Sequence, residues 1–170
     1  MIKISEHPLP HFNERPVNTA IDTIVIHSLY AKDSKDQFLA SSCIDLLNIN
    51  SVAAHYLIAR KGEAIRLVDE SKRAWHAGQS RMPFQNDQRE NVNDFSIGIE
   101  LIGSENSSFT NEQYESLADL IHDITVRHTI KNIVGHEHIA GDRKTDPGKN
   151  FDWDKLRSIL CLNHIIIGVP

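Results

Sequence analysis

The sequence has few cysteines, few aromatic residues and no long apolar run. Its two cysteines, Cys43 and Cys161, are too few for a disulfide framework, and we expect both to be reduced thiols in the core. The longest apolar run, at residues 165–169, is far shorter than the ~20 residues that a membrane-spanning helix needs. The first ten residues, MIKISEHPLP, contain no apolar stretch of the kind found in signal peptides. These absences predict a cytoplasmic protein.

An excess of basic residues is also absent. The 170-residue chain has 18 lysines and arginines against 23 aspartates and glutamates, which gives a net charge of −5. This balance provides no general attraction to a nucleic-acid backbone or an anionic membrane. Hydrophobic residues make up 40% of the chain and charged residues 24%, as in ordinary globular proteins. We therefore expect a single, monomeric domain over residues 1–170, with its core at about residues 20–160 and no nucleic-acid or membrane partner.

The spacing of apolar residues predicts strands that alternate with helices. Strands are expected at residues 21–27, 55–60, 64–68, 97–101 and 133–135, and helices at 35–50, 110–127 and from 152 onwards. Thr110 with Gln113 has the pattern of a capping box, and Asp152 that of an N-cap. Strands interleaved with helices indicate an α/β domain with a mixed β-sheet.

One short stretch, GHEHIAGDRKTDPG at residues 135–148, concentrates ionisable side chains between turn signals. It is either a solvated loop or a loop that holds a metal ion. Zinc binds imidazole and carboxylate groups, and a catalytic zinc site keeps three protein ligands. His136 and Asp146 lie at the two ends of the stretch, and His27, at the end of a predicted strand, could be the third ligand. With ten histidines in the chain other triads are possible, and His27 could instead cap a core strand.

A glutamate also interrupts an apolar strand. In the stretch IGIEL, Glu100 lies on the strand face opposite Ile99 and Leu101. Such a side chain faces solvent, a partner or a cleft, and simple exposure is one explanation. The neighbouring Gly98 lies on the same face, where it would open space for a ligand. A carboxylate beside a metal-activated water could accept the proton of that water.

Five motifs of the chain resemble those of a known family. They are IVIHS (24–28), AAHYLIARKGE (53–63), KRAWHAG (72–78), NDFSIGIEL (93–101) and GHEHIAGDRKTDPGKNFDW (135–153). Together they resemble the AmpD-like N-acetylmuramoyl-L-alanine amidases, which are related to phage lysozyme-type amidases and peptidoglycan recognition proteins. The resemblance implies a mixed central β-sheet flanked by helices, with a zinc site at one edge. It also implies hydrolysis of the amide between N-acetylmuramic acid and the L-alanine of a stem peptide.

The resemblance assigns roles to particular residues. It places one zinc ion on His27, His136 and Asp146, the proton-transferring carboxylate on Glu100, and an oxyanion-stabilising cation on Lys144. Two neutral imidazoles and one carboxylate would leave a net charge near +1 on the site, which acidifies water and polarises a carbonyl.

The same motifs provide candidates for substrate binding. His55 and His76 are expected to line the cleft, although either could be a buried, hydrogen-bonded histidine. Trp75 either stacks on a sugar ring or fills the core, and we favour the core. Arg81 and Arg89 are candidates for binding the carboxylates of the stem peptide.

Three functions are compatible with these residues. The first is a zinc amidase that cleaves muropeptides, in the 1,6-anhydro form, during peptidoglycan recycling. The second is the same reaction on polymeric peptidoglycan, by a lysin or wall-remodelling enzyme that is exported or released by a phage. The third is a module that binds peptidoglycan without cleaving it. Because such modules typically lose a metal ligand, the complete set of predicted ligands disfavours the third function.

Overall fold

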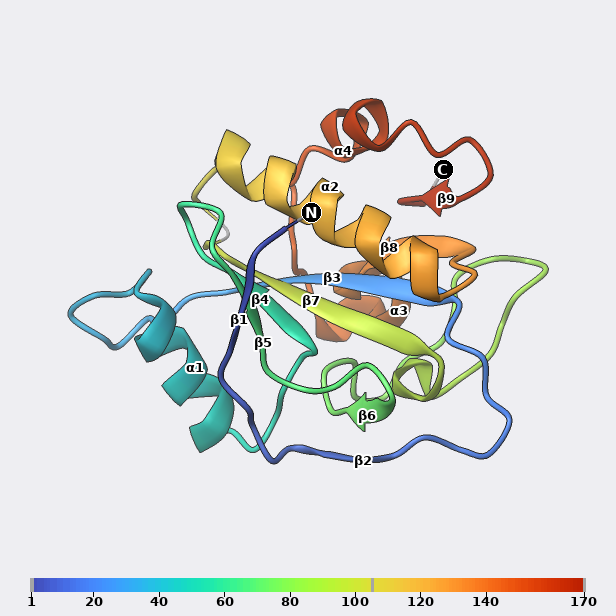
Figure 1. The fold of residues 1–170 in the computed structure, drawn as a ribbon, viewed down its shortest axis with the longest axis horizontal. Helices are drawn as coiled ribbons and strands as arrows, with labels where there is room; N and C mark the ends of the chain where they lie inside the picture. The colour runs from blue at the N-terminus through green and yellow to red at the C-terminus, as the bar shows by residue number, and fades with distance from the viewer. Residues whose placement is uncertain (1, 105, 170) are drawn as a thin grey trace.

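A seven-stranded mixed β-sheet forms the centre of the computed structural model, which describes residues 2–104 and 106–169 (Figure 1). Across the sheet the strands are β1 (Ile4–Glu6), β5 (Ala64–Arg66), β4 (Tyr56–Ile58), β7 (Ser96–Ile102), β3 (Thr23–Leu29), β8 (Asn132–Gly135) and β9 (Ile166–Ile167). The run from β4 to β9 is parallel, and the antiparallel β4–β5 pair is the hairpin expected from the sequence. Both ends of the chain thus contribute a strand to one sheet.

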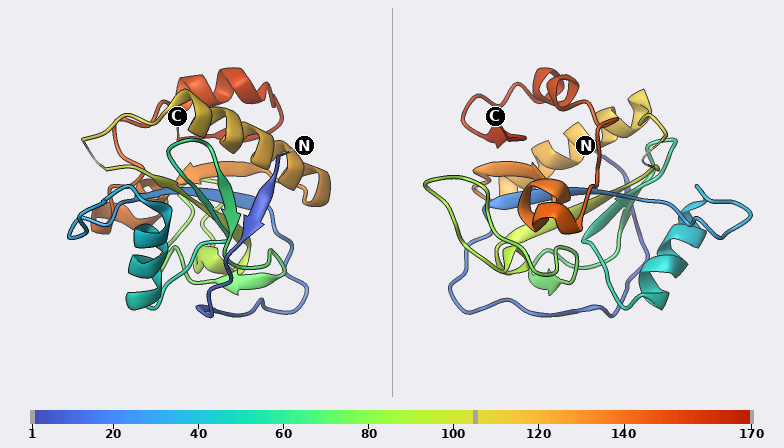
Figure 2. Two further views of the ribbon diagram at one scale, coloured as in Figure 1. Left: turned by 60° about the vertical axis from the view of Figure 1, so that its left-hand side comes forward. Right: turned by 180° about the vertical axis from the view of Figure 1, so that it is seen from behind.

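Helices cover both faces of this sheet. The longer ones are α1 (Ala40–Ile49), α2 (Asn111–Arg127) and α4 (Trp153–Leu160), and the shorter ones are α3 (His136–Ala140) and the 3₁₀ turns η1 (Val92–Asp94) and η2 (Gly141–Arg143). Helices α2 and α4 lie over one face, whereas α1, α3 and a two-stranded ribbon of β2 (Phe12–Glu14) and β6 (Lys72–Ala74) lie on the other side (Figures 1 and 2). The predicted α/β fold with a mixed, helix-flanked sheet is confirmed.

The alternation of side chains along β3 and β7 separates the core from the functional face. One set of side chains packs in the core with α2, and it comprises Ile24, Ile26, Ile97, Ile99 and Leu101. Since neighbouring residues of a strand point to opposite faces, His27 and Glu100 project from the other face. The two strands are parallel neighbours, with His27 directly opposite Glu100 in the register.

Helix α2 begins where the sequence predicts it to begin. The Thr110 hydroxyl accepts a hydrogen bond from the Gln113 backbone N–H at 3.1 Å, and the Gln113 side chain accepts one from the Thr110 N–H at 3.1 Å. This capping box satisfies two donors that the first turn of a helix leaves free. It fixes the start of the helix, so that Leu117, Ile121 and Ile124 are fully buried against the sheet.

The structure corrects two predictions, the start of helix α1 and the burial of Cys161. Helix α1 begins at Ala40 rather than at Lys35, because the preceding Asp- and Ser-rich segment forms turns, in which the Ser34 hydroxyl accepts from the Asp36 N–H at 3.3 Å. Cys161 is exposed instead of buried, because it is the C-cap of α4 and lies beyond the apolar stripe of that helix.

Other elements were not predicted. Strands β1, β2, β6 and β9 have only two or three residues each, too few for a periodic pattern. The charged stretch 135–148, expected to be a loop, contains the helical turns α3 and η2.

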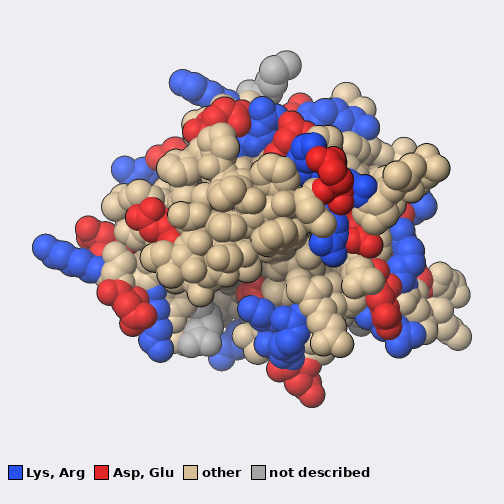
Figure 3. All heavy atoms as spheres, turned by 90° about the horizontal axis from the view of Figure 1, so that it is seen from below, with Lys and Arg blue, Asp and Glu red and all other residues tan. Residues whose placement is uncertain are grey.

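On the face shown in Figure 3, uncharged residues form a broad central area, with charged residues of both signs around it. Within residues 2–104 and 106–169, no helix is long and apolar enough to cross a membrane.

Candidate active site

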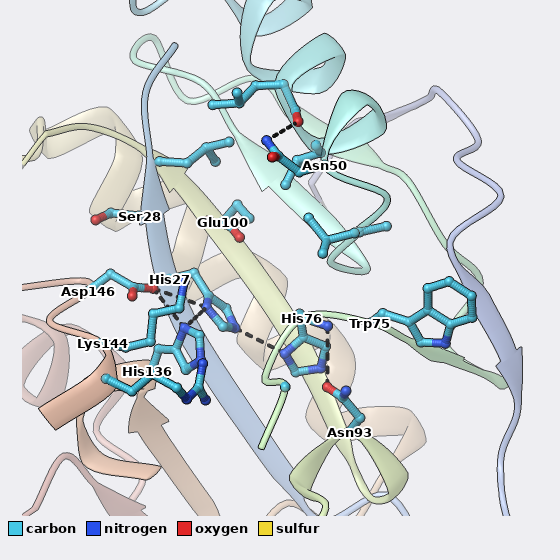
Figure 4. A pocket seen from close by; sticks show the side chains of 17 residues that line it. His27, Ser28, Asn50, Trp75, His76, Asn93, Glu100, His136, Lys144 and Asp146 are labelled. Atoms are coloured by element: carbon cyan, nitrogen blue, oxygen red, sulfur yellow. Dashed lines mark hydrogen bonds and ion pairs between the residues drawn. The ribbon is translucent and has the colours of Figure 1, made fainter. Parts of the chain in front are cut away.

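A cavity lies on the sheet face opposite α2 and collects most of the predicted functional residues (Figure 4). The predicted residues that line it are His27, Trp75, His76, Glu100, His136, Lys144 and Asp146. The strands β3, β7 and β8 run parallel, and their carboxyl ends lead into this region. Residues far apart in the sequence are thereby brought to one place.

The three predicted metal ligands converge on one point. His27 comes from β3, His136 directly follows β8, and Asp146 comes from the loop after η2. The Nδ1 atoms of His27 and His136 are 3.1 Å apart, and the Asp146 Oδ2 atom lies 3.1 Å from the first and 3.2 Å from the second. Ligand atoms about 2.0–2.1 Å from a tetrahedral zinc are separated by roughly 3.3 Å. The spacing therefore fits zinc.

The protonation of the cluster also suits a cation. The His136 Nε2 atom lies 3.1 Å from the Ala77 carbonyl oxygen. A carbonyl only accepts, so this Nε2 atom carries a hydrogen, and Nδ1 is the His136 nitrogen that faces His27 and Asp146. Burial lowers the pKa of His27 to about 4, although its hydrogen bond with Asp146 opposes the shift, so the His27 ring is neutral at pH 7. A neutral imidazole is the form of histidine that binds zinc.

The loop that carries Asp146 is closed by backbone contacts. The Glu137 N–H donates to the Asp146 carbonyl at 2.8 Å, which places the side chain of Asp146 beside that of His136. The loop also passes close to Gly135, where a Cβ atom would lie only 2.9 Å from the Pro147 Cδ atom. Glycine at residue 135 thus permits the approach that joins the two ends of the loop.

Glu100 has the properties of a proton acceptor. Its side chain is only 7% exposed, and its Oε2 atom has no hydrogen-bond partner among the described residues. Burial raises the pKa of Glu100 well above its usual value, the Asp146 carboxylate adds to the shift, and Lys144 opposes it. A buried carboxylate with a free oxygen and a raised pKa, beside a candidate metal site, is suited to general-base catalysis.

The raised pKa predicts that Glu100 destabilises the metal-free fold. A carboxyl group with a higher pKa in the folded state costs stability as the pH rises above its unfolded pKa. We therefore expect Glu100→Gln to increase the free energy of unfolding at pH 7, with an advantage that shrinks towards zero below about pH 4.3. Urea unfolding in the presence of a chelator, at a series of pH values, measures this difference.

Glu70 is a matched control, because its pKa is shifted in the opposite direction. It is 8% exposed, and although burial alone would raise its pKa, hydrogen bonds from Arg127, Tyr56 and His128 lower it to about 2. Glu70→Gln should therefore destabilise the protein at pH 7, and the loss should diminish as the pH falls towards 2. Equal destabilisation by both substitutions at pH 7 would contradict the environment assigned to Glu100.

The structure corrects three expectations near the cavity. His55 does not line the cleft: it is fully buried, where its Nδ1 atom accepts from the Gly98 N–H at 3.0 Å. Trp75 is not a core residue, since it is 38% exposed and lines the cavity. Gly98 does not open space for a ligand, because the ring of His76 occupies that space.

The arginine candidates also lie elsewhere. Arg89 pairs with Asp22 and Asp87, and Arg81 lines a neighbouring hollow, so neither lines the cavity that contains Glu100. The arginine that does line it is Arg143. Arg143 directly precedes the predicted Lys144, and this position in the sequence indicates that it lies near the cavity.

The fold and the cavity define a class of protein. A mixed sheet that holds a His–His–Asp cluster beside a buried glutamate and a lysine is a candidate metallohydrolase. Comparison with known proteins identifies the class more closely: the chain belongs to the N-acetylmuramoyl-L-alanine amidase family, whose model matches residues 17–149.

Individual relatives agree with this assignment. The 1,6-anhydro-N-acetylmuramyl-L-alanine amidase AmpD of Haemophilus influenzae is 39% identical, over 88% of this chain and 88% of its own length. A crystal structure of a selenomethionine derivative of AmpD matches with a TM-score of 0.83 and 35% identity, over 94% of this chain and 96% of that one. Escherichia coli AmiD, solved with the substrate anhydro-N-acetylmuramic acid-L-Ala-D-γ-Glu-L-Lys, matches with a TM-score of 0.69 and 31% identity, over 86% and 60% of the two chains.

Proposed function

We propose that the protein is a zinc-dependent amidase that releases the stem peptide from 1,6-anhydro-muropeptides. One observation supports this most strongly: the convergence of His27, His136 and Asp146 within 3.2 Å of one another, in the cavity that also contains Glu100. The names of the similar amidases support the choice of the 1,6-anhydro substrate. The bond to be cleaved joins the lactyl carbonyl of the muramic acid to the nitrogen of L-alanine.

The side chains present can carry out each proton transfer of this hydrolysis. Zinc bound to His27, His136 and Asp146 would acidify a water molecule and polarise the lactyl carbonyl. Glu100 accepts a proton from the attacking water and then transfers it to the alanine nitrogen as the C–N bond breaks. Lys144, which lines the cavity two residues before Asp146, stabilises the negative charge that develops on the carbonyl oxygen. The products are an amine and a carboxylate.

The role of Lys144 predicts a selective loss. Because its charge matters most in the transition state, Lys144→Ala should lower kcat by about 10–1000-fold with only a small change in KM. Lys149→Ala is the matched control, since Lys149 is an exposed lysine of the same segment that does not line the cavity. Steady-state kinetics on a soluble muropeptide measure both variants. An increase in KM with an unchanged kcat in the Lys144 variant would contradict this role.

We further propose that soluble fragments, rather than intact cell wall, are the substrate, which is the reaction of a cytoplasmic recycling enzyme. The net charge of −5 supports this, because it provides no general attraction to an anionic polymer. The test compares the rates at which the purified protein releases stem peptides from a soluble 1,6-anhydro-muropeptide and from sacculi, with products identified by mass. Equal rates would contradict the recycling function and favour a lysin. Binding to either substrate without release of peptide would indicate a recognition module.

A further inference from the structure

In His27 and His136, the ring nitrogen that faces away from the proposed metal is Nε2. These two Nε2 atoms contact consecutive residues of one segment. The His27 Nε2 atom lies 3.0 Å from the His76 Nδ1 atom, and the His136 Nε2 atom lies 3.1 Å from the Ala77 carbonyl oxygen (Figure 4 shows the His27–His76 contact). Metal-binding histidines are commonly oriented by a hydrogen bond from the nitrogen that faces away from the ion. Here, two residues that follow β6 make both of these contacts.

This segment is itself fixed in place. The buried Asn93 side chain accepts hydrogen bonds from the backbone N–H groups of His76 at 3.3 Å and of Ala77 at 2.8 Å. The His76 ring fills a hollow in the sheet at Gly98, where a Cβ atom would lie 2.6 Å from the ring. A side chain at residue 98 would therefore displace His76 from its position beside His27.

The contacts of His76 define a directional chain of hydrogen bonds. If the His27 Nδ1 atom binds the metal, the His27 Nε2 atom carries the hydrogen and donates it to the His76 Nδ1 atom. His76 then carries its hydrogen on Nε2, which lies 3.3 Å from the Ser96 hydroxyl oxygen. Each donor thus faces an acceptor, and this arrangement excludes a hydrogen on the His76 Nδ1 atom.

From this geometry we infer that His76 is a positioning residue, which holds His27 in the tautomer and orientation that bind zinc through Nδ1. The Ala77 carbonyl does the same for His136, so that one segment, anchored by Asn93, sets the directions of two ligands. The inference rests on the proposed zinc site and deepens it. His76 lines the cavity, but its role is exerted through His27 and requires no contact with the substrate.

An isosteric pair of substitutions separates this role from a purely structural one. Asparagine and leucine both branch at Cγ, but only asparagine places an acceptor oxygen where histidine has Nδ1. We expect His76→Leu to raise the Kd for zinc by about 10–100-fold, the usual effect of losing an outer hydrogen bond to a ligand. His76→Asn should stay within a few-fold of the unsubstituted protein. Competition with a chromophoric chelator measures zinc binding, and thermal unfolding of the metal-free proteins checks that both variants fold.

The outcomes distinguish this inference from the proposed function. If the unsubstituted protein binds no zinc, the proposed function fails. If it binds zinc while both folded variants bind equally well, or lose affinity equally, the positioning role fails. A measurement on the unsubstituted protein applies even if a variant does not fold: long-range ¹H–¹⁵N NMR spectra of the zinc form should show His27, His76 and His136 protonated at Nε2. A hydrogen on Nδ1 of His27 or of His76 would overturn the inference.

Discussion

Glu100→Gln is expected to lower turnover by about 10²–10⁴-fold, the usual contribution of general acid–base catalysis. Glutamine keeps the shape of the side chain but cannot accept the proton of the attacking water. The zinc content should not change, because Glu100 is not among the three residues whose ligand atoms converge. Single-turnover kinetics on a soluble 1,6-anhydro-muropeptide and metal analysis of the same sample measure the two quantities.

A second glutamate provides the control for this substitution. Glu137 directly follows the proposed ligand His136, yet it does not line the cavity. Glu137→Gln should therefore retain a rate close to that of the unsubstituted protein. If Glu100→Gln were as active as Glu137→Gln, the proton transfer assigned to Glu100 would be wrong.

Asp146→Asn is expected to weaken zinc binding more than any change in the residues that support the ligands. Loss of an outer hydrogen bond typically costs 10–100-fold, so replacement of a charged ligand by a neutral amide should raise the Kd by more than about 100-fold. Hydrolysis at limiting zinc should fall in proportion. Equilibrium dialysis against buffered zinc, followed by metal analysis, measures the affinity.

Asp142→Asn is the matched control, because Asp142 is an exposed aspartate of the same segment that does not line the cavity. It should bind zinc with unchanged affinity. Full zinc occupancy in an Asp146→Ala variant would refute the ligand set of His27, His136 and Asp146.

The sequence predicts the central elements of the fold because their residues repeat with a clear period. Strand β7 alternates apolar residues with Gly98 and Glu100, and the capping box of α2 fixes the start of that helix. Short strands such as β1 and β9 depend on backbone pairing with β5 and β8, which leaves no pattern in two or three residues. The sequence therefore predicts the core better than the edges of the sheet.

In the active site, too, the features that depend on backbone contacts leave no pattern in the sequence. The family motifs led to the ligand set and to Glu100, and the structure brings these residues together. The contacts that orient His27 and His136 could not be predicted. One is made by the backbone carbonyl of Ala77, and the other depends on the space that Gly98 leaves for the His76 ring. His76 and His55 both lie in motifs that resemble those of the family, and only the structure shows that His76 contacts His27 whereas His55 is fully buried.

The most direct test of the zinc amidase function is a titration of zinc into the metal-free protein during hydrolysis of a soluble 1,6-anhydro-muropeptide. We expect the rate of stem-peptide release to rise linearly and to level off at one zinc per chain, with a carboxyl group on the sugar and a free alanine amine as products in the mass spectrum. Cleavage at full rate without zinc, or cleavage of a different bond, would contradict the proposed function.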